Sequence, residues 1–284
     1  MGQSRTIQAG LALILLQCTN IALAMPFLNE SLTYNAFYQG VFSAQQQIGI
    51  ADVTWDTSSI QVGETGEPAI ETRMMVSSEP YKYVETRYPL RLVYRSLILL
   101  DPVRSIAYEK YDSTEQHGRD LTWLNEISGV VLRFREGHKP EGKATRQLPA
   151  ALEKWGSQQQ EYQYYKNARH KLLPGMVDRM ALLQQIRGEE LSVGARYKVP
   201  VTDGKYRYIY KVRVVSDKLF IAAGRKWNAL KLKFYGYHIK DGKKIQDHKP
   251  LLVWLDNTPR RIPLRFEYRN AFGRFVINLQ SIDT

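Results

Sequence analysis

The sequence predicts a mainly β protein, with a curled antiparallel sheet that forms an open or incomplete β-barrel, or β-spiral, with one to three inserted helices. Three observations predict this fold. Apolar and polar residues alternate in most segments, Gly, Asn and Pro recur between those segments, and the alternation stops only near residues 148–187. So many strands tend to curl or close, because long open edges invite pairing with other chains.

The clearest alternation lies in the C-terminal third, at 205–213 and 230–234, within a predicted antiparallel meander that runs to about residue 280. One face of these two strands is apolar and supplies the candidates for lining a cavity: Tyr206, Tyr208, Tyr210, Leu232 and Phe234. The other face is cationic and supplies the candidates for contact with an anionic surface: Arg207, Lys211, Arg213, Lys231 and Lys233. Alternation alone does not distinguish a packed core from a ligand cavity.

The N-terminal part alternates at 32–38 and has further strand candidates near 46–54, 72–77, 82–99 and 105–111. Residues 112–146 are polar, and we expect a long excursion around one strand at 130–134. Helices are predicted over 148–173, with a break at Gly156, and over 176–187, where Asp178 suits the N-terminus and Gly188 the end. We therefore expect one domain, 25–284, with a helical or loop insertion at about 113–175.

The first 24 residues have the pattern of a cleaved signal peptide. Arg5 precedes a short apolar run at 11–16, and Ala22-Leu23-Ala24 forms a small-x-small site, so we expect cleavage after Ala24 and a periplasmic protein. Cys18 permits a lipoprotein signal instead, although Gln17 is larger than the residue that such a site requires. The run is too short to cross a bilayer as a helix, and we expect no transmembrane span.

The chain has a formal net charge of +12, which falls to +11 when Arg5 leaves with the leader. An exported protein meets little nucleic acid, so anionic lipid, lipopolysaccharide or peptidoglycan are the expected partners, with an envelope protein as a further possibility. The simpler interpretation is that the lysines and arginines are solvated faces of strands.

Catalytic motifs are absent in their standard forms, with no nucleophile elbow, metalloprotease helix or glycine-rich phosphate loop. The histidines are scattered: His117, His138, His170, His238 and His248. We expect His170 at a helix surface. His238 and His248 flank one turn, and a metal or proton-relay role for them is the weaker interpretation.

Asp112, Glu115 and Asp120 cluster on a polar loop. We therefore expect a non-enzymatic protein without metal or cofactor.

Residues 254–266 form a tryptophan-led strand, an aspartate turn, an arginine, a proline and a second strand, with Trp254, Asp256, Arg261 and Pro263 as the marked positions. This hairpin resembles that of a bacterial envelope family named domain of unknown function 3108, as do segments 26–40, 177–187 and 199–214. More distantly it resembles periplasmic lipoprotein carriers, which implies an open barrel around a hydrophobic cavity with helices as a lid. The four residues are expected to shape the hairpin rather than bind a ligand.

The leading hypothesis is a periplasmic protein of envelope maintenance that binds a lipid or other amphipathic ligand in a half-barrel cavity. The alternative is a structural adaptor with a filled core, which docks to an envelope protein or peptidoglycan through 113–175. A hydrolase ranks last.

Overall fold

The computed structural model describes residues 29–40, 46–62, 66–100, 103–112, 119–136, 152, 155, 162–164, 169–240, 243–246 and 249–283. Two helices are bounded within these ranges, α1 (Lys82–Glu85) and α3 (Arg179–Arg187). The strands are β1 (Glu30–Gly40), β2 (Ile48–Val62), β3 (Glu67–Ser77), β4 (Arg91–Leu100), β5 (Val103–Asp112), β6 (Asp120–Asn125), β7 (Val130–Glu136), β8 (Tyr162–Tyr164), β9 (His170–Lys171), β10 (Val177–Asp178), β11 (Arg196–Thr202), β12 (Arg207–Ala222), β13 (Arg225–Lys240), β14 (Lys243–Gln246), β15 (Leu251–Asp256), β16 (Pro263–Arg269) and β17 (Gly273–Asp283).

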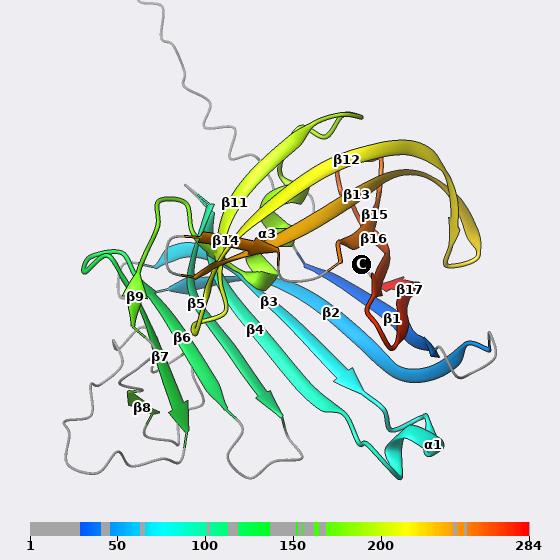
Figure 1. Cartoon of the computed structure of the whole chain (residues 1–284), viewed down its shortest axis with the longest axis horizontal. Coiled ribbons are helices and arrows are strands. Elements are labelled where there is room, and N and C mark those ends of the chain that lie inside the picture. The colour runs from blue at the N-terminus through cyan, green and yellow to red at the C-terminus, as the bar shows by residue number, and fades with distance from the viewer. Residues whose placement is uncertain are drawn as a thin grey trace, which may run out of the picture.

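All of these strands belong to one sheet, which curls around α3 (Figure 1). Its order is β10-β11-β12-β13-β15-β16-β17-β1-β2-β3-β4-β5-β6-β7, with β14 on one end of β13 and with β8 and β9 on β7. Only β10 and β11 pair in parallel among the described strands. The N-terminal strand β1 therefore lies in the middle, between β17 and β2, and joins the two halves of the sheet.

The apolar and polar residues that alternate in the sequence correspond to residues that alternate between buried and less buried positions in the strands. In β1, Leu32, Tyr34 and Ala36 are buried while their neighbours are half-buried. The C-terminal meander runs through β17 to Asp283, as expected. The prediction of a mainly β, open barrel-like sheet with inserted helices is confirmed.

Helix α3 lies on the concave side of the sheet and is held at both ends. Asp178 caps its N-terminus by accepting hydrogen bonds from the backbone N–H groups of Met180 and Ala181. The Asp178 carboxylate also accepts a hydrogen bond from Ser96 in β4, at 2.6 Å. At the other end, Arg187 forms a fully buried ion pair with Glu30 of β1. The helix is thus fixed to β4 at its start and to β1, the strand that joins the two halves of the sheet, at its end.

The polar excursion expected at 112–146 is partly wrong. It contains two strands, β6 and β7, which form a hairpin with buried Leu121, Leu132 and Phe134. Within the stretch expected to be helical, Leu152 and Trp155 are in helical conformation, but Tyr162–Tyr164 and His170–Lys171 are strands that pair with β7. The unpaired edge of β7 explains this, because hydrogen bonds to that edge outweigh a weak local preference for helix. Arg169, Leu172 and Leu173 are described and are neither helical nor in a strand, and the remaining residues of 148–173 lie outside the described ranges.

One smaller departure concerns the N-terminal half. Residues 82–99, expected as one strand, contain the short helix α1 followed by β4. None of the described helices is long and apolar enough to cross a membrane. The predicted leader lies outside the described residues.

Candidate ligand-binding cavity

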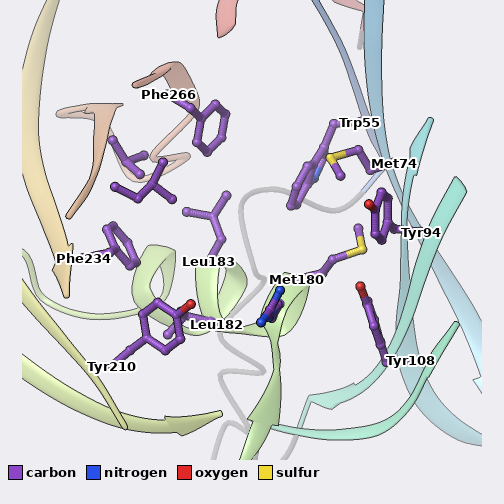
Figure 2. Close-up of a pocket in the computed structure, with 13 residues that line it drawn as sticks. Trp55, Met74, Tyr94, Tyr108, Met180, Leu182, Leu183, Tyr210, Phe234 and Phe266 are labelled. Atoms are coloured by element: carbon purple, nitrogen blue, oxygen red, sulfur yellow. The ribbon is translucent and has the colours of Figure 1, made fainter. Parts of the chain in front are cut away.

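An apolar cavity of about 270 Å³ lies between the two walls of the curled sheet, with α3 as its floor (Figure 2). Figure 2 shows Trp55, Met74, Tyr94 and Tyr108 along one wall, and Tyr210, Phe234 and Phe266 along the other. The lining residues are Trp55, Met74, Tyr94, Tyr108, Arg179, Met180, Leu182, Leu183, Tyr210, Phe234, Leu251, Val253 and Phe266.

We call the wall formed by Trp55, Met74, Tyr94 and Tyr108 the aromatic wall. The register of its strands aligns these side chains. Trp55 in β2 lies directly opposite Met74 in β3, and Met74 lies directly opposite Tyr94 in β4. The ring of Tyr94 stacks on that of Tyr108 in β5, with centroids 6.4 Å apart. One cross-strand row therefore presents two large rings and a flexible thioether to the cavity.

Polar groups are few: Arg179 on α3, the indole of Trp55 and the hydroxyls of Tyr94 and Tyr108 on one wall, and the hydroxyl of Tyr210 on the other. Arg179 is the one charged lining residue, its side chain is 46 % exposed, and its Nη2 donates to Asp203 at 3.0 Å. Because Arg179 is both exposed and in the lining, it marks a mouth through which solvent reaches the cavity. Burial lowers the pKa of Arg179, but Asp203 and nearby tyrosines outweigh this, so its pKa is raised and the guanidinium stays charged.

The tyrosines are held as neutral donors. Burial raises the pKa of Tyr94, and it raises the pKa of Tyr108 well above the ordinary value, so both phenols keep their protons. The indole N–H of Trp55, a residue that is 6 % exposed, has no hydrogen-bond partner among the described residues. A buried donor without a partner costs free energy.

The five residues expected to line a cavity are divided by the structure. Tyr210 and Phe234 line it. Tyr208 and Leu232 are buried in the adjoining core, and the Tyr208 hydroxyl donates to Asp203 at 3.0 Å. Tyr206 is 40 % exposed, outside the lining, because β12 begins only at Arg207 and Tyr206 belongs to the preceding turn, where Lys205 lies over its ring.

The five cationic candidates lie on or near the opposite, outer face. Lys211 and Arg213 line a separate hollow there, together with residues of β11 and β13. Lys233 lies directly opposite Arg213, and Lys231 lies over the ring of Trp254, 4.8 Å from its centroid. Arg207 lies near His170, and its charge adds to burial, the larger cause, in lowering the pKa of that imidazole.

The four marked residues of the 254–266 hairpin make structural contacts. Asp256 is 1 % exposed and accepts hydrogen bonds from the backbone N–H of Ile262 and the hydroxyl of Thr258, both at 2.6 Å. Arg261 has a positive φ of 49° and donates to Asn257. The carbonyl of Pro263 accepts from Tyr34, and Trp254 stacks on Phe220. Asp256 and Arg261 shape the turn, while Trp254 and Pro263 tie it to neighbouring strands.

Sequence reasoning missed the aromatic wall and α3's contribution. Trp55 stands in an alternating strand, and Tyr94 and Tyr108 stand in apolar-rich ones, so each reads as ordinary core. Arg179 follows the capping Asp178, where a cation gives no functional signal. Among the described residues no group of His, Cys, Asp and Glu is placed to hold a metal ion. His238 contacts the rings of Tyr206 and Tyr208, whereas His248 lies outside the described residues.

Comparison with known proteins gives a family and a fold. Residues 33–280 match the family described as protein of unknown function DUF3108, and no curated protein matches the chain. A crystal structure of a β-barrel-like protein of domain of unknown function DUF1849 from Brucella abortus superposes with a TM-score of 0.53 at 9 % identity, covering 92 % of this chain and 99 % of that one. At that identity the likeness shows the fold alone.

Two further crystal structures are more remote. One, described as a putative lipoprotein from Parabacteroides distasonis, gives a TM-score of 0.33 at 6 % identity, with 90 % of this chain and 95 % of that chain covered. The other, described as a putative exported protein from Bacteroides fragilis, gives 0.32 at 10 % identity, with 90 % and 96 % covered. The fold assignment rests on the first comparison.

Proposed function

This chain belongs to the DUF3108 family, whose function is unknown, and we propose from its cavity that it binds a single-chain amphipathic ligand with an anionic head. The observation that carries the proposal is the composition of the lining, in which one solvent-reached arginine stands at an otherwise apolar and aromatic cavity. Small-molecule sites have this character, with apolar walls and a few polar groups that fix orientation.

The size of the cavity selects the ligand class. A volume of about 270 Å³ is just below the roughly 300–1,000 Å³ of typical ligand pockets. Such a volume suits one acyl chain, or part of one, better than a whole diacyl lipid. The apolar chain would lie against Trp55, Leu183 and Phe266, and a carboxylate or phosphate would meet Arg179 with Tyr94 and Tyr108 as neutral donors.

Envelope maintenance and a periplasmic location belong to the same proposal. They are supported by the leader-like start of the sequence, with Arg5, the apolar run and Ala22-Leu23-Ala24. Binding without catalysis is proposed because the lining offers no nucleophile beside a base and no pair of carboxylates.

The first test is native mass spectrometry of the protein secreted with its own leader, followed by extraction and identification of any bound lipid. A stoichiometric single-chain amphiphile supports the proposal. An empty protein is then titrated with dansyl-undecanoic acid, a fluorescent acid with an apolar chain. If the wild-type protein neither retains a lipid nor binds this probe, the cavity is a packing defect and the proposal is wrong.

A matched pair of variants locates the site. Leu251 and Leu252 are adjacent and half-buried in β15, but only Leu251 lines the cavity, because successive side chains point to opposite faces. Leu251→Trp should fill the cavity and reduce probe affinity by about tenfold or more, while Leu252→Trp should leave it unchanged. Arg179→Gln should lower the affinity for the probe more than Arg179→Lys does, because lysine keeps the positive charge. Equal losses for both leucine variants would mean that the probe binds elsewhere.

A further inference from the structure

A second hollow, of about 480 Å³, lies on the outer face of β11, β12 and β13. We propose that it is a binding site for phosphate-bearing groups, separate from the apolar cavity. Its lining side chains include four exposed cations, Arg196, Lys198, Lys211 and Arg213, with the half-buried rings of Tyr235 and Tyr237 beside them.

The strand register concentrates these cations in two neighbouring rows. Arg196 lies directly opposite Arg213, which lies directly opposite Lys233, so three cations cross three strands in line. In the next row Lys198 lies opposite Lys211. Like charges directly opposite each other destabilise a sheet. Five cations are gathered here, and a bound anion would stabilise the arrangement by offsetting their mutual repulsion.

Few acidic groups in the described structure lie near these rows: Glu189 and Glu190 act on the lining Tyr197, but neither lines the hollow or forms an ion pair with a row cation. The three strands carry two, four and five lysines or arginines, in chain order, against a single carboxylate, Asp217. Asp217 accepts a hydrogen bond from Asn257 and does not line the hollow. Among the described residues, none of the five row cations forms an ion pair, whereas Glu267 on β16 is surrounded by Arg265, Arg269 and Arg274.

The chemistry of the lining favours phosphate over a carboxylate. Two guanidinium groups provide planar forks that match the oxygens of a phosphate, and two ammonium groups add point charges within the same hollow. The ring of Tyr237 lies 4.9 Å from the Lys211 ammonium and fixes its place beside the hollow. A ligand with several phosphates can engage both rows at once.

The phosphate can be free or carried on a lipid headgroup, and the experiment separates the two. Binding of inorganic tripolyphosphate is measured by calorimetry, and binding of vesicles is measured by co-sedimentation with phosphatidylglycerol–phosphatidylcholine mixtures and with phosphatidylcholine alone, at low and high salt. Binding to tripolyphosphate identifies a site open to soluble phosphates. Binding only to the phosphatidylglycerol vesicles identifies a headgroup site. In either case high salt should weaken binding.

Two double variants each remove two positive charges, one inside the hollow and the other outside it. Arg196→Gln with Arg213→Gln should reduce affinity by about tenfold, and Arg196→Lys with Arg213→Lys, which keeps the charges but loses the planar forks, should give a smaller loss. Lys226→Gln with Lys249→Gln, two exposed lysines outside the hollow, should leave affinity within about twofold. Equal losses in both glutamine pairs, or no binding of either probe by the wild-type protein, would overturn the proposal. Dansyl-undecanoic acid binding should be unchanged in all of them, because the cavity is on the other face.

Discussion

At the scale of single residues, His170 shows how tertiary contacts change a side chain's chemistry. The sequence places it between Arg169 and Lys171, which indicates a solvated surface position. In the structure it lies in β9, half-buried, with Nε2 3.1 Å from the Thr202 hydroxyl of β11. Burial, and secondly the charge of Arg207, lowers the pKa of His170 from 6.5 to about 4, although Asp203 opposes the shift.

This shift predicts a loss of stability in mild acid. Above about pH 6.5 the imidazole is neutral in both states, and its contribution is complete. As the pH falls toward 4 the unfolded chain takes up the proton first, so the free energy of unfolding should drop by up to about 3 kcal/mol. His170→Gln should remove this part of the pH dependence. Urea unfolding between pH 4 and 7 measures it, and an NMR titration that gave His170 a pKa near 6.5 would contradict it.

At the scale of elements, α3 shows how a short helix is fixed inside a curled sheet. A nine-residue helix is marginal by itself in water, so its stability comes from contacts. Arg187 and Glu30 are both fully buried, and Arg187 also bonds to Gln184 and to the carbonyl of Arg260. Gln184 in turn donates to Thr72 of β3 at 3.2 Å. These contacts hold the floor of the cavity against its walls.

Removing one partner of the buried pair should be far more harmful than removing both charges. Arg187→Met leaves the Glu30 carboxylate buried without its main partner and should cost about 3–5 kcal/mol in the free energy of unfolding. Adding Glu30→Gln removes that charge and should restore a substantial part. Arg87→Met, at an exposed arginine, should change stability by less than about 0.5 kcal/mol. Urea unfolding measures all three variants. A double variant with a lower free energy of unfolding than Arg187→Met would show that the two charges are not coupled.

At the scale of the whole molecule, the distant segments of the curl meet at the turn between β11 and β12. Gly204 in this turn has a φ of +85°, and a Cβ built there would overlap the hydroxyl of Thr122 in β6. Residues 202–206 and 120–125 are far apart in the sheet order, so this contact and the His170–Thr202 contact bring opposite regions of one sheet together. Among the described strands no backbone ladder joins β11 to β6, but side-chain contacts close the barrel at this point.

A pair of glycine variants tests this closure. Gly224, in the turn between β12 and β13, also has a positive φ, +70°, but has open space around it. Gly224→Ala should therefore cost only backbone strain, about 1 kcal/mol. Gly204→Ala should cost about 2–4 kcal/mol, because the clash adds to the strain, and Thr122→Ala should relieve part of it. Thermal and urea unfolding give the values. Equal costs at the two glycines would mean that the turn and β6 do not touch.

The sequence by itself determined the local periodicity and the family. Alternation at 32–38 and 205–213 fixes which side chains share a face, and Asp178 with Gly188 sets the limits of α3, because these are effects of neighbours along the chain. The motifs around Trp254 and Asp256 identified the family that the match over 33–280 shows. Only the tertiary structure decided that Tyr210 and Phe234 line a cavity while Tyr206 does not, and that Trp55, Tyr94 and Arg179 complete it. Those outcomes depend on sheet curvature and on strands paired across long separations, which no local pattern encodes.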